Sequence, residues 1–251
     1  MSAHHACSVR PAMVALCAAS LATLAACGGN SCVSLGGGCG GTTATPNVTI
    51  SGTAATGTAL ASAAVNLSCA QGSGSTLTNG GGQYTITFDA TPPCILTVTS
   101  GGVSLHSLAF AGGTFNTTPE TELMLVYLAS QLGTSESGLI AGFPTSSQYQ
   151  QVLANQADVQ AAQSAVVTNL QQHYTVTLTV PAFLTMAFTV GQAGVDSDLG
   201  ILTAAGAIDA NGLPDPAAVS LLSAAGAAHP LGTTSAPSSG TGGTGSGSGM
   251  M

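Results

Sequence analysis

The chain has 251 residues, of which only 4% are charged, with nine Asp and Glu against a single Lys or Arg. That one cation is Arg10, so no basic side chain follows it. A nucleic-acid surface needs several cations to release the counterions of the phosphates, and a polybasic membrane patch needs them to bind anionic lipids. The composition therefore excludes both, and it excludes Lys or Arg from any catalytic role beyond residue 10.

The first 26 residues have the layout of a secretory signal peptide. Arg10 gives the N-terminal segment a positive charge, and residues 11–24 (PAMVALCAASLATL) form an apolar run. This run is too short for a bilayer-spanning helix, which needs about 20 residues. The pattern predicts a signal peptide over residues 1–26 that is removed on export.

The apolar run ends in Leu24-Ala25-Ala26-Cys27. This sequence resembles the lipobox of bacterial lipoproteins, a Leu-x-small-Cys motif that is cut just before the Cys, whose thiol is then acylated. The resemblance implies that lipid on Cys27 anchors the protein to a membrane of the bacterial envelope. Gly28, rather than Asp, after the Cys is similar to the pattern sorted to the outer membrane. An ordinary signal peptide followed by an incidental Cys is the alternative.

Four cysteines remain beyond the anchor: Cys32, Cys39, Cys69 and Cys94. An even number in an exported chain indicates two disulfides, with three pairings open. Spacing favours Cys32–Cys39 as a small loop and Cys69–Cys94 inside a folded domain. The absence of a Cys-x-x-Cys sequence argues against a thioredoxin-like redox site and against a four-thiol zinc site.

Composition divides the mature chain into a folded part between two Gly-rich ends. Residues 27–45 are rich in Gly, Ser and Thr and are predicted to form a flexible tether. Residues 231–251 are predicted to be a disordered tail for the same reason. The part that can fold lies between them.

Apolar residues alternate with small polar ones from residue 46 to 115. The alternation is clear over residues 63–69, 84–88 and 94–98, and Gly-rich turns follow at 79–82 and 100–102. This period of two predicts short strands with one buried face, and several at this spacing suggest a β-sandwich. Cys69 and Cys94 share the inward parity of their strands, so a buried disulfide between them is expected.

Three of these segments carry a family resemblance. Residues 48–53 (VTISGT), 63–67 (AAVNL) and 82–86 (GQYTI) resemble the strands of the carboxypeptidase regulatory-like module. The resemblance implies a prealbumin-like (transthyretin-like) antiparallel sandwich of about seven strands without catalytic residues. Some related folds bind carbohydrate, although no binding residue transfers to this chain.

From residue 116 to 230 the apolar period changes to 3.6, which predicts a helical domain and an α+β, two-domain fold class. Thr118-Pro119-Glu120 is a helix start, and Gly133 ends that helix. We expect a polar loop over 134–147, a second helix over 147–174, a strand over 175–180 and a last helix from Asp215-Pro216 to about Ala228. The apolar stripe of the 147–174 helix either docks on its own domain or binds a coiled-coil partner.

Few residues are candidates for catalysis. Glu120 and Glu122 could act as a glycosidase pair only if about 5–9 Å apart in a cleft, but residues two apart on a helix point to different sides. We therefore expect both to interact with the helix dipole. The three mature histidines are His106 on a strand, His173 at a helix end and His229 before the tail, and no nucleophile motif accompanies them.

The clustered aspartates are Asp196, Asp198, Asp209 and Asp215. The stretch 209–212 begins like a calcium loop but lacks the later ligands of an EF-hand. We expect Asp196 and Asp215 to cap helices and Asn211-Gly212 to form a turn. No metal, cofactor or catalytic residue is predicted, and the chain is predicted not to be an enzyme.

The predicted function is a lipid-anchored envelope lipoprotein with a structural or interaction role, whose partner is an envelope protein or a glycan. A carbohydrate-binding module is the alternative, and it requires exposed aromatic rings. A hydrolase, the third hypothesis, requires a cleft with convergent polar groups. The residues that discriminate the first two are Tyr84, Tyr127, Tyr149 and Tyr174.

Overall fold

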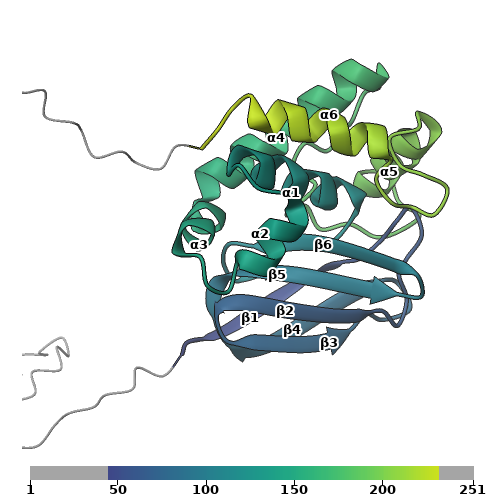
Figure 1. The fold of residues 1–251 in the computed structure, drawn as a ribbon. Coiled ribbons are helices and arrows are strands. Elements are labelled where there is room, and N and C mark those ends of the chain that lie inside the picture. Colours follow the sequence, from purple (N-terminus) through teal and green to yellow (C-terminus); the bar gives the residue numbers. More distant parts are fainter. Residues whose placement is uncertain (1–44, 232–251) are drawn as a thin grey trace, which may run out of the picture. The chain divides into compact units, whose positions relative to one another are not determined.

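The computed structural model describes residues 45–231 (Figure 1), and these belong to one compact unit. Seven strands and six helices lie within that range, which confirms the predicted α+β class. The strands all precede the helices in the chain. The signal peptide, most of the tether, nearly all of the tail, and Cys27, Cys32 and Cys39 lie outside the described residues.

The strands form two sheets. The first has the order β4-β1-β7, made of β1 (Asn47–Thr53), β4 (Gln83–Asp89) and β7 (Gly113–Thr114). The second has the order β3-β2-β5-β6, made of β2 (Ala64–Gln71), β3 (Ser73–Leu77), β5 (Thr91–Ser100) and β6 (Val103–Ala109). All pairs are antiparallel except β1 with the two-residue β7, which is parallel.

The period-two alternation is confirmed in β2, where Val65, Leu67 and Cys69 are buried between exposed or half-buried neighbours. In β5 it fails, because residues 93–96 are buried without interruption. Helices cover this part of the second sheet (Figure 1), with α1 against β6 and α3 against β5. A strand covered on both faces buries consecutive residues.

Cys69 and Cys94 are bonded, as predicted, with an S–S distance of 2.01 Å. They are direct partners in the antiparallel pairing of β2 with β5. Both are buried in the core, which also contains Leu67 and Leu96. The disulfide therefore ties together two neighbouring strands of the second sheet.

The helices are α1 (Pro119–Gln131), α2 (Glu136–Gly142), α3 (Ser147–Ala154), α4 (Gln156–Tyr174), α5 (Val195–Ala204) and α6 (Pro216–Ala227). The predicted start of α1 is confirmed, because the Thr118 side chain accepts from the Thr121 backbone N–H. Residues 123–129 of α1 are all buried, since this helix contacts β6, α2, α4 and α6. It is the central helix of the unit.

Three predicted elements are wrong. The 134–147 segment contains α2, which Ser135 caps by accepting from Gly138 N–H. The single 147–174 helix is two, because Asn155 leaves the helical conformation and its side chain caps α4 by accepting from Ala157 N–H. Residues 175–180 form no strand in the described chain, because side chains rather than a neighbouring strand bind the N–H groups of residues 178–180.

The apolar stripe of α4 docks within its own unit. Val159, Val166 and Leu170 are buried in the shared core. This outcome agrees with the first of the two interpretations of the stripe. Across residues 45–231, no helix has both the length and the apolar character needed to cross a membrane.

Candidate functional site

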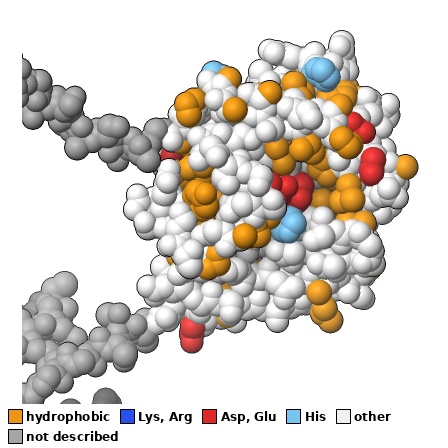
Figure 2. All heavy atoms as spheres, viewed as in Figure 1, with side chains coloured by type: hydrophobic (Ala, Val, Ile, Leu, Met, Phe, Trp, Pro, Cys, Tyr) orange, Lys and Arg blue, Asp and Glu red, His pale blue; other side chains and the backbone are white. Residues whose placement is uncertain are grey.

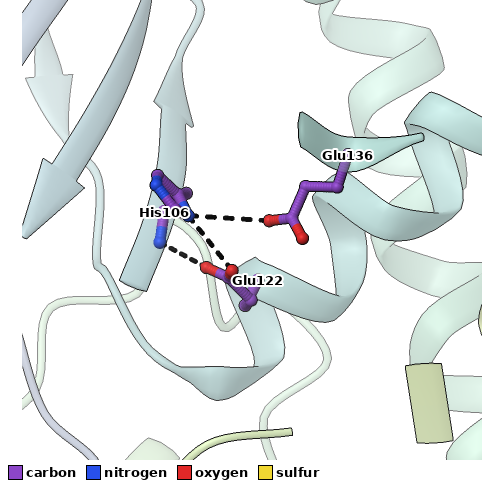
Figure 3. Close-up of side chains that lie close together, drawn as sticks. All are labelled: His106, Glu122 and Glu136. Atoms are coloured by element: carbon purple, nitrogen blue, oxygen red, sulfur yellow. Dashed lines mark hydrogen bonds and ion pairs between the residues drawn. The ribbon is translucent and has the colours of Figure 1, made fainter. Parts of the chain in front are cut away.

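His106, Glu122 and Glu136 form a cluster, called here the His106 cluster, at the junction of the second sheet and the helices (Figure 3). They come from β6, α1 and α2. Nδ1 of His106 lies 3.1 Å from Oε1 of Glu122 and 3.7 Å from Oε1 of Glu136. Among the described residues, no other group of three His, Cys, Asp or Glu side chains is close enough to hold one metal ion.

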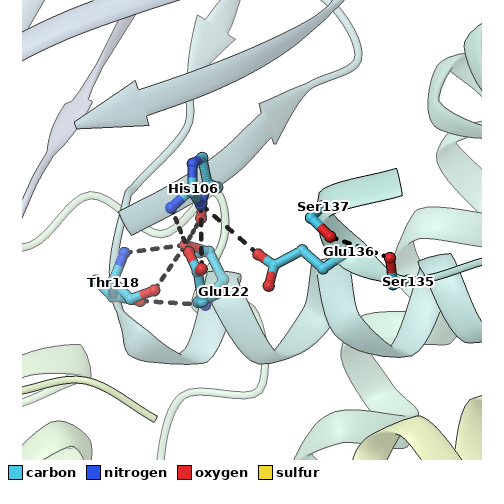
Figure 4. Close-up of polar contacts among 7 residues, drawn as sticks. His106, Thr118, Glu122, Ser135, Glu136 and Ser137 are labelled. Carbon is cyan, nitrogen blue, oxygen red and sulfur yellow. Dashed lines mark hydrogen bonds and ion pairs between the residues drawn. The ribbon is translucent and has the colours of Figure 1, made fainter. Parts of the chain in front are cut away.

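The position of β6 at an edge of its sheet explains how the cluster forms. An edge strand presents unpaired N–H and C=O groups that need partners. The backbone N–H of His106 donates to Oε2 of Glu122, and Oγ1 of Thr121 donates to the His106 carbonyl over 3.0 Å. Thr118 N–H in turn donates to Oγ1 of Thr121, and the Thr118 carbonyl accepts from Glu122 N–H, so that Thr118 lies beside Glu122 (Figure 4). The first turn of α1 therefore covers the edge of β6 and fixes Glu122 beside the His106 ring.

Glu136 approaches the same ring from the first turn of α2 (Figure 3). Its Oε1 is buried and has no hydrogen-bond partner among the described residues. Burial and the neighbouring Glu122 carboxylate raise the pKa of Glu136 to about 9. In the metal-free protein Glu136 therefore keeps its proton at neutral pH.

The electrostatics of the cluster follow from the composition. The chain has no Lys or Arg after Arg10, so no such cation can neutralise these carboxylates within residues 45–231. Both ion pairs found in that range involve His106. Figure 2 shows a His side chain directly beside acidic side chains on the viewed face, with hydrophobic side chains next to them.

A second pair of carboxyl groups lies deeper in the unit. Glu120 is 1% exposed, and neither of its oxygens has a hydrogen-bond partner in the described part of the chain. Burial and the charge of Asp198 raise the pKa of Glu120 well above its ordinary value. Asp198 is also buried, but it accepts hydrogen bonds from Thr179 N–H, Thr179 Oγ1 and Val180 N–H. Asp198 thus fixes the irregular 175–180 segment to α5.

The two helix glutamates diverge as predicted. Both lie in the first turn of α1, but Glu122 contacts His106 whereas Glu120 is buried near Asp198. They form no glycosidase-like pair facing one hollow. Both residues lie in the first turn of α1, as the expected interaction with the helix dipole requires, but that expectation does not predict the contacts of their side chains.

The aspartate predictions are partly confirmed. Asp215 caps α6 by accepting from Ala217 N–H at 2.8 Å. The predicted turn at Asn211-Gly212 is present, with Gly212 N–H donating to the Asp209 carbonyl. The cap at Asp196 is wrong, because Gly194 is the N-cap of α5. Asp196 lies one residue inside the helix and accepts from Gly191 N–H instead.

The predicted positions of the three histidines are confirmed, but the sequence does not predict the His106 cluster. His106 lies on β6, His173 in the last turn of α4, and His229 is exposed after α6. Nothing in the spacing connects His106 with residues 16 and 30 positions later in the sequence. The sequence signal that could have pointed to the cluster is the small number of acidic residues. The chain has only three Glu, and two of them contact one His in the structure.

The tyrosines are not exposed in the described structure. Tyr84 and Tyr127 are buried, and the Tyr84 hydroxyl donates to the Phe115 carbonyl. Tyr149 and Tyr174 are half-buried and pack against the core. Each of the four therefore presents at most part of its ring to solvent.

Two of the surface hollows in the described unit are large enough to hold a small ligand. One, of about 530 Å³, is lined by hydroxyl and amide side chains, such as Asn79 and Gln83, and by apolar and aromatic ones, such as Leu77 and Phe188. The other, of about 470 Å³, lies along α4 beside Gln160 and Gln163. No His, Cys, Asp or Glu lines either hollow, so neither brings together an acid, a base and a nucleophile.

Comparisons with known protein families, curated proteins and solved structures find no match for the chain. The resemblances to a lipobox and to a carboxypeptidase regulatory-like module therefore stay predictions. Function is inferred from the motifs of the sequence, the His106 cluster and the lining of the two hollows.

Proposed function

We propose that the chain is an exported lipoprotein, anchored through lipid on Cys27 to the bacterial envelope and sorted to the outer membrane. The described unit would serve there in a structural or interaction role, without catalysis, toward an envelope protein or a glycan. The observation that carries the proposal is Leu24-Ala25-Ala26-Cys27 at the end of the apolar run that starts at Pro11. A thiol at that place is where a lipoprotein receives its acyl chains.

The Cys69–Cys94 disulfide supports export. Structural disulfides persist in oxidising compartments and are rare where thiols are kept reduced. This one is buried between two central strands of the second sheet. Its location is that of a structural bond rather than of an exposed redox pair.

The finer architecture is also part of the proposal: a prealbumin-like sandwich over 46–115 followed by a helical domain over 116–230. Within the described residues, all seven strands lie between 47 and 114, and all six helices lie between 119 and 227. Two residues that carry the family resemblance meet at one point. The Tyr84 hydroxyl donates to the Phe115 carbonyl, and a Cβ on Gly52 would lie 1.8 Å from that same oxygen.

A non-catalytic role is favoured over the other two hypotheses. A hydrolase needs convergent polar groups in a cleft, whereas the two hollows lack His, Cys, Asp and Glu. Sugar recognition by stacking needs an exposed ring, whereas every Tyr of the described unit is buried or half-buried. A surface that binds another envelope component needs neither feature.

The test is metabolic labelling with radioactive palmitate in a bacterial host, followed by separation of membranes from soluble protein. The wild type is expected to be labelled and to sediment with membranes. Cys27→Ser should lose the label and the membrane association, while Cys32→Ser, the matched control five residues away, should keep both. Labelling of Cys27→Ser at the wild-type level would overturn the proposal.

A further inference from the structure

We propose that His106, Glu122 and Glu136 bind a divalent transition-metal ion of the Zn²⁺ type, through Nδ1 of His106 and one carboxylate oxygen of each Glu. This site goes beyond the proposed function. It depends only on the described unit, so it stands or falls independently of the lipid anchor.

The donor atoms have suitable chemistry and spacing. Imidazole nitrogen and carboxylate oxygen bind Zn²⁺ at about 2.0–2.2 Å, which places tetrahedral ligand atoms about 3.4 Å apart. Nδ1 of His106 is 3.1 Å from the Glu122 oxygen and 3.7 Å from the Glu136 oxygen. All three donors lie within 4.8 Å of one another. Small side-chain rotations therefore suffice to surround one ion.

The hydrogen bonds around the cluster hold the first two ligands in place. Oε2 of Glu122 accepts the His106 backbone N–H, which leaves Oε1 directed at the ring. The Thr121 hydroxyl binds the His106 carbonyl, so the backbone on both sides of the ring is attached to α1. Such outer contacts orient metal ligands and raise metal affinity.

The third ligand provides an independent observation. Oε1 of Glu136 is buried without a hydrogen-bond partner, yet it lies 3.7 Å from Nδ1 of His106. A buried acceptor left unpaired costs free energy. A metal ion between Glu136, Glu122 and His106 would satisfy this oxygen.

Charge and exposure favour the same occupant. Metal binding displaces the proton of Glu136 to solvent, since a ligating carboxyl must be deprotonated. Two carboxylates and one neutral imidazole then balance a divalent cation, and the described residues offer no Lys or Arg to compete. The side chains of His106, Glu122 and Glu136 are 21%, 13% and 21% exposed, so an ion can enter from solvent. Three protein ligands leave a fourth position for water. The nitrogen ligand and small ligand number favour Zn²⁺-type ions over Ca²⁺ or Mg²⁺, which take six or more oxygens.

The experiment is a calorimetric titration of Zn²⁺ into the purified protein after removal of metal with EDTA. The key variant is Glu136→Gln, because an uncharged amide of the same shape suits the partly buried position and should fold. Asp89→Asn and His229→Ala are the matched controls, since both remove exposed metal-ligating side chains elsewhere. Circular dichroism of each variant verifies folding.

The wild type and both controls should bind one Zn²⁺ per protein chain at this site, and saturating Zn²⁺ should raise their melting temperature. Glu136→Gln should bind at least about 100-fold more weakly, since outer contacts alone contribute 10–100-fold, and its melting temperature should not respond. Co²⁺ bound in place of Zn²⁺ should show ligand-field bands without thiolate charge transfer, which excludes Cys32 and Cys39 as the ligands. Equal Zn²⁺ affinity of the wild type and Glu136→Gln, or no binding by the wild type, would overturn the proposal.

Discussion

Removing the Cys69–Cys94 cross-link tests the energetics of the second sheet. The two residues are 25 positions apart. The disulfide keeps this loop closed in the unfolded chain and so lowers the conformational entropy of the unfolded state. The loop-entropy relation gives about 3.5 kcal/mol of stabilisation for a loop of this length at 25 °C. Cys69→Ala/Cys94→Ala should therefore lower the free energy of unfolding by about that amount.

The assay is urea unfolding of the exported protein, followed by circular dichroism, with a thermal melt beside it. For a folded unit of this size, 3.5 kcal/mol corresponds to a loss of roughly 7–14 °C in melting temperature. The denaturant m-value should rise in the double variant, because an unfolded chain without the cross-link exposes more surface.

Each single variant also breaks the bond, so it should lose nearly as much stability as the double variant. A double variant within about 1 kcal/mol of the wild type would refute the entropic reasoning. An unchanged m-value would do the same, because it would show that the cross-link does not restrict the unfolded chain.

Three further predictions concern charge and packing. Since burial and Asp198 raise the pKa of Glu120, the folded chain keeps a proton that the unfolded chain releases above about pH 4.3. The free energy of unfolding should then fall as the pH rises, by up to about 1.4 kcal/mol per pH unit. In urea unfolding without metal, Glu120→Gln should lose less stability than the wild type between pH 5 and 8. Equal losses in the two proteins would contradict this prediction. Gly226→Ala would place a Cβ 2.3 Å from the Tyr127 carbonyl and should destabilise the contact of α1 with α6 by about 1–3 kcal/mol. Gly200→Ala has open space around its Cβ and should stabilise α5 by up to about 1 kcal/mol. Similar effects of the two substitutions on chemical unfolding would contradict the packing of α1 against α6. High NaCl should raise the melting temperature slightly by screening self-repulsion, and a large loss of stability would contradict an ion-pair network limited to His106 in the described chain.

Local signals explain which elements were predictable. The alternation in β2 and the Thr118 cap of α1 are encoded within a few residues, and both were predicted correctly. The break at Asn155 is not predictable in this way, because Asn155 lies in a polar helix face that contains several other amide side chains. Only the structure shows that the Asn155 side chain caps α4. The 175–180 segment alternates like a strand, but Asp198, some 20 residues later, takes its N–H groups.

The candidate site was beyond sequence reasoning for a related reason. His106, Glu122 and Glu136 each have an ordinary local role on a strand or in a first helical turn. They meet because the unpaired edge of β6 is covered by the start of α1, with α2 following immediately in the chain. Only the tertiary structure brings an unpaired Glu136 oxygen next to the ring.

The most direct test of the central claim, lipid anchoring through Cys27, is the intact mass of the mature protein purified from bacterial membranes. The predicted mass is that of residues 27–251 with at least a diacylglyceryl group on the thiol of Cys27, and with one further acyl chain where the Cys27 amine is also acylated. Peptide sequencing should place the N-terminus at Cys27. A mature N-terminus elsewhere, or an unmodified Cys27 in membrane-bound protein, would contradict the claim.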